Sequence, residues 1–160
     1  MKKIILLIPL FFFTLTNAYA LEVQCQFEEV YRDGSNQQGI FFLDNNRLRY
    51  QYHNPQLYSL IYNNLELYAV QNNNTHFYQK VTDRYNIIRL LNDISDDFPD
   101  FQSVYRYNKQ EVIVERSQNT NFIKRLVFKS DQLNLSIYFQ NCKFMKIDQT
   151  LFTVKNFVKS

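Results

Sequence analysis

The feature that most constrains the fold of this chain is the alternation of apolar and polar residues in short segments. Apolar side chains recur at every second position around Leu48, Leu67 and Ile137. A period of two places successive side chains on opposite faces of a strand, so these segments are typical of half-buried antiparallel strands. Further strand-like segments occupy residues 22–32, 38–43, 56–62, 75–81, 101–107, 111–116, 122–129, 142–147 and 151–157.

Short runs of asparagine separate these segments at the positions where tight turns are expected. The 160 residues include only 2 glycines, whereas asparagines adjoin one another at 45–46, 63–64 and 72–74. Asparagine tolerates the left-handed backbone conformation and can therefore replace glycine in a tight turn. Short, regularly spaced strands joined by short turns predict one mainly β domain, built as a meander or a barrel.

One segment breaks the alternation. Over residues 84–93 the apolar side chains recur at helical spacing, Asp83 is suited to cap a helix, and Asp96, Asp97 and Pro99 follow its expected end. A short amphipathic helix among strands must bury its apolar stripe on the sheet. Two interpretations remain open, because the helix either fills the core or forms a lid over a cavity.

The first twenty residues have the pattern of a secretory signal peptide. Lys2 and Lys3 precede an apolar run over 4–13, and Ala18 and Ala20 provide a small-residue cleavage site. The run is too short to span a membrane. Cleavage after Ala20 predicts an exported mature chain, 21–160, and removes two of the 18 basic residues and none of the 15 acidic ones. The remaining net charge of about +1 provides no basic surface for nucleic acid.

The chain contains two cysteines, and both fall in strand-like segments near the ends of the mature chain. Cys25 is in the first of these segments and Cys142 in a late one. In an oxidising compartment such a pair favours a disulfide that joins the first strand to a late strand. Two separate buried thiols are the alternative.

Residues suited to catalysis or to metal binding are few. His53 and His76 are isolated, and neither has the spacing of a two-ligand metal motif. Four aspartates fall within 93–100, but the segment lacks the glycine and the terminal glutamate of a calcium loop. A solvated acidic loop after the helix is therefore favoured, and we expect no enzyme activity, no metal and no cofactor.

A long stretch of the sequence resembles a known family. The segment 39–70, GIFFLDNNRLRYQYHNPQLYSLIYNNLELYAV, has a strand starting at Gly39, then an Arg-aromatic-x-Tyr-x-x-Pro segment at 49–55, a strand, a tight turn and another strand. This order resembles the bacterial outer-membrane lipoprotein carrier proteins, the LolA family. CQFEEVYRDG, NIIRLLND and LSIYFQNCKFMKIDQTLFTV resemble its opening, middle and closing segments, so the resemblance covers essentially the whole mature chain.

The resemblance implies a half-open antiparallel β-barrel with a short helical lid. In such a carrier a hydrophobic concave cavity shelters lipoprotein acyl chains, or other lipid, between an inner-membrane donor complex and an outer-membrane acceptor. The family pattern implies that Arg49 latches the lid. We expect the cargo cavity to be lined by Leu48, Tyr50, Tyr52, Ile61, Leu67, Ile87, Leu90 and Leu91.

Several features depart from the family pattern. The predicted mature chain enters its first strand without the usual helix, Tyr50 stands where the family usually has Trp, the segment 129–132 is short, and the cysteine pair is not part of the pattern. Alternation also leaves Arg49 on the face opposite Leu48 and Tyr50, so a plain surface arginine is the alternative to a latch. A non-catalytic structural or adhesive periplasmic β-domain without a lipid cavity is the alternative function.

Overall fold

The structure is a computed structural model that describes residues 21–74, 77–82, 87–107, 110–129 and 134–154. The predicted signal peptide, 1–20, lies outside the described residues. So do the predicted helix cap at Asp83, His76 and most of the short segment at 129–132.

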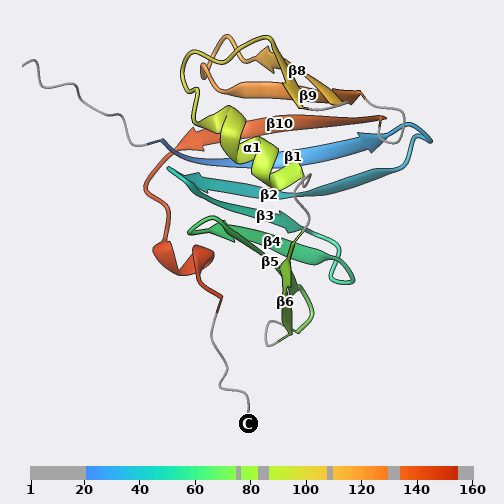
Figure 1. Ribbon diagram of the computed structural model, residues 1–160, viewed down its shortest axis with the longest axis vertical. Coiled ribbons are helices and arrows are strands. Elements are labelled where there is room, and N and C mark those ends of the chain that lie inside the picture. The colour runs from blue at the N-terminus through green and yellow to red at the C-terminus, as the bar shows by residue number, and fades with distance from the viewer. Residues whose placement is uncertain (1–20, 75–76, 83–86, 108–109, 130–133, 155–160) are drawn as a thin grey trace, which may run out of the picture.

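Ten antiparallel strands form one curved, unclosed sheet, which confirms the predicted mainly β class (Figure 1). In space the order is β6-β5-β4-β3-β2-β1-β10-β9-β8-β7, so the first and the last strand are neighbours in the middle. The chain thus builds two meanders, one on each side of the β1–β10 pair. The strands are β1 (Glu22–Tyr31), β2 (Asn36–Asp44), β3 (Arg47–Tyr52), β4 (Tyr58–Asn63), β5 (Glu66–Gln71), β6 (Tyr78–Val81), β7 (Val104–Tyr107), β8 (Gln110–Arg116), β9 (Ile123–Lys129) and β10 (Asn134–Phe144).

Asparagine makes the tight turns, as the sequence predicts. Asn45 and Asn64 both have φ of 51°, in the β2–β3 and β4–β5 hairpins. Gly39 in β2 is required for close packing and not for a turn, because a Cβ there would collide with the Gln51 carbonyl and the Phe27 ring. Glycine therefore lets the Phe27 ring lie flat on the backbone of β2.

The predicted disulfide between Cys25 and Cys142 is present, and it joins β1 to β10. The register between these strands shifts between Gln24 and Gln26, so that β10 has one more residue than β1 at this point. Asn141 takes a positive φ of 51° in this bulge. The bulge brings the two cysteine Cα atoms to 4.1 Å, across 117 residues of sequence.

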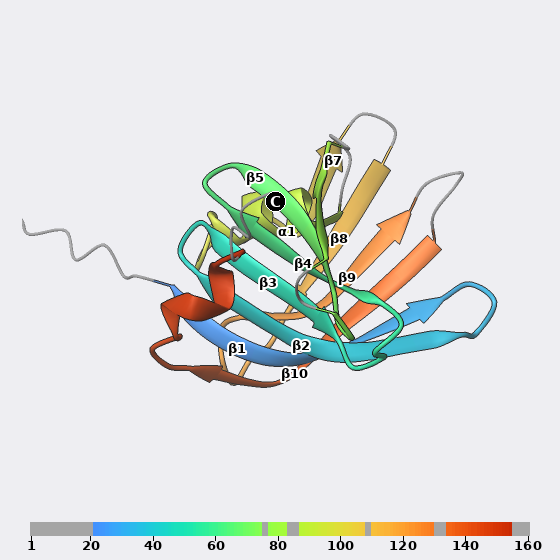
Figure 2. The same cartoon turned by 90° about the horizontal axis from the view of Figure 1, so that it is seen from below.

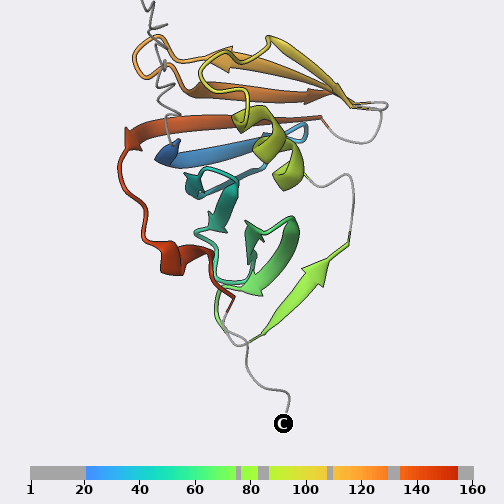
Figure 3. The ribbon, with the colours of Figure 1, turned by 60° about the vertical axis from the view of Figure 1, so that its left-hand side comes forward.

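The two faces of the sheet are covered by different segments. Helix α1 (Ile87–Ser95) packs against β3 and β4 on the concave face, whereas the 3-10 helix η1 (Gln149–Phe152) packs against the same strands on the convex face. Figure 2 shows α1 inside the curve of the sheet and η1 outside it, and Figure 3 shows the same two layers from another side.

Two sequence predictions differ from the structure near the C-terminus. The two segments predicted as separate strands, the alternating one around Ile137 and the one at 142–147, run together in the single strand β10, which ends at Phe144. The described part of the predicted strand 151–157 is not a strand, and η1 occupies its start. β10 already pairs with β1 on one side and with β9 on the other. It therefore has no free edge on which a following hairpin strand could pair. Asp148 instead caps η1 by accepting from the Thr150 amide at 2.9 Å.

Candidate functional site

The concave face of the sheet and helix α1 meet in one apolar core. Seven of the eight residues predicted to line a cargo cavity belong to this core or pack against its border. Leu48, Tyr50, Leu67 and Leu91 are each 0% exposed, and Leu90 is buried. Tyr52 and Ile87 are half-buried at the border. In this conformation the helix thus lies on the predicted cavity residues, and their side chains fill the space between helix and sheet.

Ile61 is the exception among the predicted cavity residues. Its Cα partner across β3 is Arg49, whereas Leu48 and Tyr50 pair with Tyr62 and Leu60. Side chains alternate between faces, so Ile61 points to the convex side together with Arg49. There it is 1% exposed, beneath the C-terminal segment. The sequence could not decide this, because β4 carries three large apolar residues in succession, and either face can accept such a run.

Arg49 holds the C-terminal segment in place. Its Nη1 donates to the Leu151 carbonyl at 3.0 Å, and its Nε donates to Gln51 Oε1 at 2.9 Å. Both partners lie on the face opposite α1. In the described part of the chain, Arg49 therefore bonds to the C-terminal segment and not to the predicted lid. Burial lowers the pKa of the Arg49 guanidinium. The predicted latch residue is therefore neither a latch on the helix nor a plain surface arginine.

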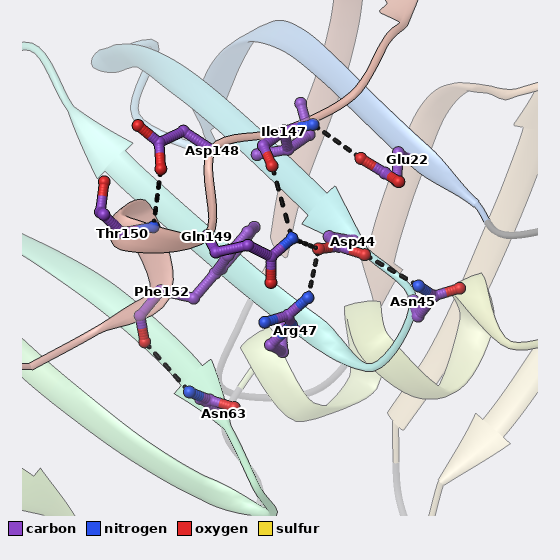
Figure 4. Close-up of polar contacts among 10 residues, drawn as sticks. All are labelled: Glu22, Asp44, Asn45, Arg47, Asn63, Ile147, Asp148, Gln149, Thr150 and Phe152. Carbon is purple, nitrogen blue, oxygen red and sulfur yellow. Dashed lines mark hydrogen bonds and ion pairs between the residues drawn. The ribbon is translucent and has the colours of Figure 1, made fainter.

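Further polar contacts tie residues 145–154, here called the C-terminal strap, to the convex face (Figure 4). Gln149 donates to Asp44 Oδ2 at 2.7 Å, and Asn63 donates to the Phe152 carbonyl at 3.1 Å. Asp44 also pairs with Arg47, whose guanidinium lies 5.3 Å from the centre of the Phe152 ring. Sequence reasoning missed this network, because its partners are about 90 to 105 residues apart along the chain.

Replacing Arg49 by leucine is expected to loosen the strap and to leave α1 unchanged. The loss of one charged donor to a partly buried carbonyl costs about 1 to 2 kcal/mol, so amide exchange in residues 147–153 should accelerate roughly 5- to 30-fold. Hydrogen exchange with mass spectrometry measures both segments. Arg106→Leu, an exposed change in β7, is the matched control. Faster exchange in 87–95 with an unchanged strap would contradict this assignment.

A buried carboxylate on the concave face was not foreseen from the sequence. Glu29, in β1, is 1% exposed and accepts hydrogen bonds from three tyrosines. Its Oε1 accepts from Tyr50 at 2.9 Å and from Tyr52 at 3.1 Å, and its Oε2 accepts from Tyr31 at 2.6 Å and from Tyr52 at 3.2 Å. The signal in the sequence was the alternation itself, since Cys25, Phe27, Glu29 and Tyr31 share one face.

The three phenols keep their protons in this environment. Burial is the main cause that raises the pKa of each tyrosine above its ordinary value, and the charge of Glu29 raises it further. The hydroxyl groups therefore remain hydrogen-bond donors at neutral pH. None of the ion pairs that the described residues form involves Glu29, so its only partners there are the three hydroxyl groups.

A surface groove lies against this cluster. It has a volume of about 340 Å³ and is lined by Tyr31, Gln37, Tyr52, Leu57, Tyr58 and Leu60. Two of the tyrosines that donate to Glu29 thus form part of the groove wall. Tyr58 is 37% exposed at its rim. Tyr52 is held in place by edge-to-face contacts with Phe27 and Tyr50, at 5.5 Å and 5.4 Å between ring centres.

The acidic segment after α1 is partly engaged with the domain. Asp97 accepts a hydrogen bond from the Tyr105 hydroxyl at 2.6 Å. Burial is the main cause that raises the pKa of Tyr105 to about 12, and this hydrogen bond is the second. Among the described residues, no group of three or more His, Cys, Asp or Glu side chains is placed to hold a metal ion. In the same part of the chain, no helix has the length and apolar character needed to cross a membrane.

Comparisons with known proteins leave the family of this chain open. No protein-family model matches the chain, and no curated protein is significantly similar to it. The resemblance to the LolA family thus depends on the order of the segments quoted above.

Proposed function

We propose that the mature chain is a periplasmic carrier that shelters acyl chains on its concave face when α1 moves away. The observation that carries this proposal is the open sheet. An apolar concave face extends across the sheet, and in the described part of the chain a single helix of nine residues covers it. A helix of this length is marginal by itself and depends on its packing against the sheet.

Two polar groups weaken the seating of α1. Asn92 is 5% exposed, and its Oδ1 accepts no hydrogen bond among the described residues. Arg89 Nε is likewise buried without a partner there. A buried polar atom without a partner costs about 1 to 3 kcal/mol, and displacement of the helix would return both atoms to water. The seated position of α1 is therefore less favourable than its apolar contacts alone would make it.

Acyl chains are suited to replace the helix on this face. They require a dry apolar surface and no directional bonds, and each methylene removed from water contributes about 0.8 kcal/mol. Ten methylenes would contribute roughly 8 kcal/mol, which is comparable to the burial of Ile88, Leu90, Leu91 and Ile94 of α1 at about 1.5 to 3 kcal/mol each. The disulfide is compatible with an oxidising compartment.

The resemblance supplies the remaining parts of the proposal. The cargo would be the acyl chains of lipoproteins, or other lipid, carried toward the outer membrane. An inner-membrane donor complex would load the carrier, and an outer-membrane acceptor would unload it. No catalytic role and no cofactor are included. The alternative is a structural or adhesive periplasmic β-domain. The filled core favours this alternative, because in such a domain α1 would stay packed against the sheet permanently.

The test is a titration of the mature chain with a fluorescent fatty acid, comparing two buried substitutions. Leu91→Ala removes an anchor of the helix, raises the open fraction and should tighten the apparent affinity about tenfold, because affinity scales with the binding-competent fraction. Ile61→Ala is the matched control. It is equally buried but lies on the convex face, so the affinity should stay within about twofold.

The alternatives give different results in the same titration. If neither the fatty acid nor a lipopeptide binds the wild-type chain, the structural β-domain becomes the better proposal. If both variants change the affinity equally, the helix is not the element that gates the face. Circular dichroism establishes that each variant is folded, and a chelator should leave binding unchanged.

A further inference from the structure

We propose that the groove beside Glu29 binds an organic ammonium group. The ammonium groove is defined by its lining residues, Tyr31, Gln37, Tyr52, Leu57, Tyr58 and Leu60, with the carboxylate of Glu29 behind the first and third of them. The groove is open at the surface. Its occupation therefore does not require α1 to move, and the inference goes beyond acyl-chain carriage.

Glu29 is a buried acidic group without a cationic partner among the described residues. Carboxylates are rarely buried to this degree unless a positive group is close, because the charged form loses its hydration. Glu29 is 1% exposed and has hydrogen bonds from Tyr31, Tyr50 and Tyr52. None of the ion pairs among the described residues includes it. The hydroxyl dipoles compensate only part of the charge, so the site retains a negative potential.

The negative potential of Glu29 is directed into the groove through the hydroxyl groups of Tyr31 and Tyr52. Tyr31 and Tyr52 use their hydroxyl protons on Glu29, at 2.6 Å and 3.1 Å, so each phenol oxygen presents lone pairs and not a proton, apart from the contact that the two hydroxyl groups make with each other. Both residues line the groove. A donor in the groove would thus meet acceptor oxygens that are polarised by a carboxylate directly behind them.

Half of the residues that line the groove are aromatic. Tyr31, Tyr52 and Tyr58 supply three aromatic rings around one groove, and aromatic rings attract organic cations through their quadrupoles. Leu57 and Leu60 add apolar surface for the carbon atoms beside a charged nitrogen. A hydrated metal ion would find few free oxygens here, because both oxygens of Glu29 already accept hydrogen bonds. The chemistry therefore fits an ammonium group that carries carbon.

The source of the ammonium group is either a lipid head group or a free amine. Dihexanoyl phosphatidylethanolamine, dihexanoyl phosphatidylglycerol and ethanolamine separate the two sources. The two lipids share their chains and differ in the amine, and both are used below their critical micelle concentrations. Chemical shifts of ¹³C-labelled tyrosine rings in the mature, disulfide-bonded chain report binding at the groove.

We expect phosphatidylethanolamine to bind at least tenfold more tightly than phosphatidylglycerol and to shift the Tyr31 and Tyr52 signals. Glu29→Gln should reduce this preference to within about twofold, since it removes the charge and keeps an acceptor. Glu28→Gln is the matched control, because its side chain is on the opposite face and bonds to Asn36 and Gln38. Tyr58→Leu, at the exposed rim, should weaken binding about threefold or more. This second variant tests the groove even if Glu29→Gln fails to fold.

The outcomes separate this inference from the carrier proposal. Equal affinity for the two lipids in the wild-type chain would overturn the inference and leave acyl-chain carriage intact. A preference that survives both Glu29→Gln and Tyr58→Leu would also overturn it. Binding of ethanolamine with Glu29 dependence, but of no acyl probe, would support the ammonium groove and contradict the carrier. Ethanolamine binding as tight as that of the lipid would identify a free amine as the source.

Discussion

Replacing Cys25 and Cys142 together by alanine is expected to lower the free energy of unfolding by about 4 to 5 kcal/mol. The disulfide closes a loop of 117 residues, and in the chain-entropy model a loop of this length restricts the unfolded state strongly. Alanine is chosen because Cys25 is 1% exposed, and a serine hydroxyl would add a buried polar group. Urea unfolding followed by circular dichroism measures the change.

The wild-type chain supplies the control for this prediction. Unfolding of the wild type in the presence of a reductant should approach the stability of the double alanine variant, because both lack the cross-link. A fall of less than 1 kcal/mol in both experiments would mean that the β1–β10 pairing already restricts the unfolded chain without the bond. The disulfide-bonded protein should also be two hydrogens lighter by mass than its reduced form.

The size of this effect depends on where the bond lies in the sheet. β1 and β10 are the only connection between the two meanders within the described sheet, and they come from near the two ends of the described residues. Pairing of such distant segments has a large loop-closure cost before any contact forms. The disulfide removes this cost from refolding, so the reduced chain should also fold more slowly.

Local patterns in the sequence were sufficient to predict most strands of this fold. The period of two, the asparagine turns and the amphipathic helix are each encoded within about ten residues, and the structure has each of them. The described helix continues to Ser95, two residues beyond the predicted end, where Ser95 Oγ donates to the Leu91 carbonyl. The cysteine pair supplied the one long-range contact that the sequence could predict.

Features that depend on several distant segments could not be predicted in this way. The strand order places β10 beside β1, and this pairing leaves the following residues to form a strap instead of another strand. The strap in turn buries Ile61 and accepts the hydrogen bond from Arg49. The unpredicted strap therefore explains why both residues differ from their predicted roles. Alternation placed Arg49 on the correct face, whereas its family role depended on an element that lies on the other face.

Glu29 illustrates a different limit of sequence reasoning. The Glu28-Glu29 step offers two acidic residues, one on each face of β1, and an acidic side chain is normally assigned to solvent. Only the convergence of Tyr50 and Tyr52, from β3, with Tyr31 makes the inward position acceptable. Such convergence depends on the register between β1, β2 and β3, which alternation alone does not define.

Replacing Glu29 by alanine is expected to lower the free energy of unfolding by about 3 to 5 kcal/mol. The change removes the acceptor from Tyr50, which is fully buried, and from Tyr31 and Tyr52, which are half-buried. An unpaired hydroxyl in the core costs about 1 to 3 kcal/mol, whereas the two half-buried hydroxyls can turn partly to water and cost less. Urea unfolding of the disulfide-bonded mature chain measures the total.

Two further variants decide whether orphaned hydroxyls cause the loss. Glu29→Gln keeps an acceptor oxygen and should cost only about 1 to 2 kcal/mol. The double change Glu29→Ala with Tyr50→Phe removes the buried donor together with its acceptor and leaves the same space at residue 29, so it should be more stable than Glu29→Ala, although it lacks more polar contacts. If the double variant is the less stable of the two, the loss in Glu29→Ala comes from a cavity and not from the Tyr50 hydroxyl. The hydrogen bonds to the carboxylate would then contribute little to the stability of the concave face.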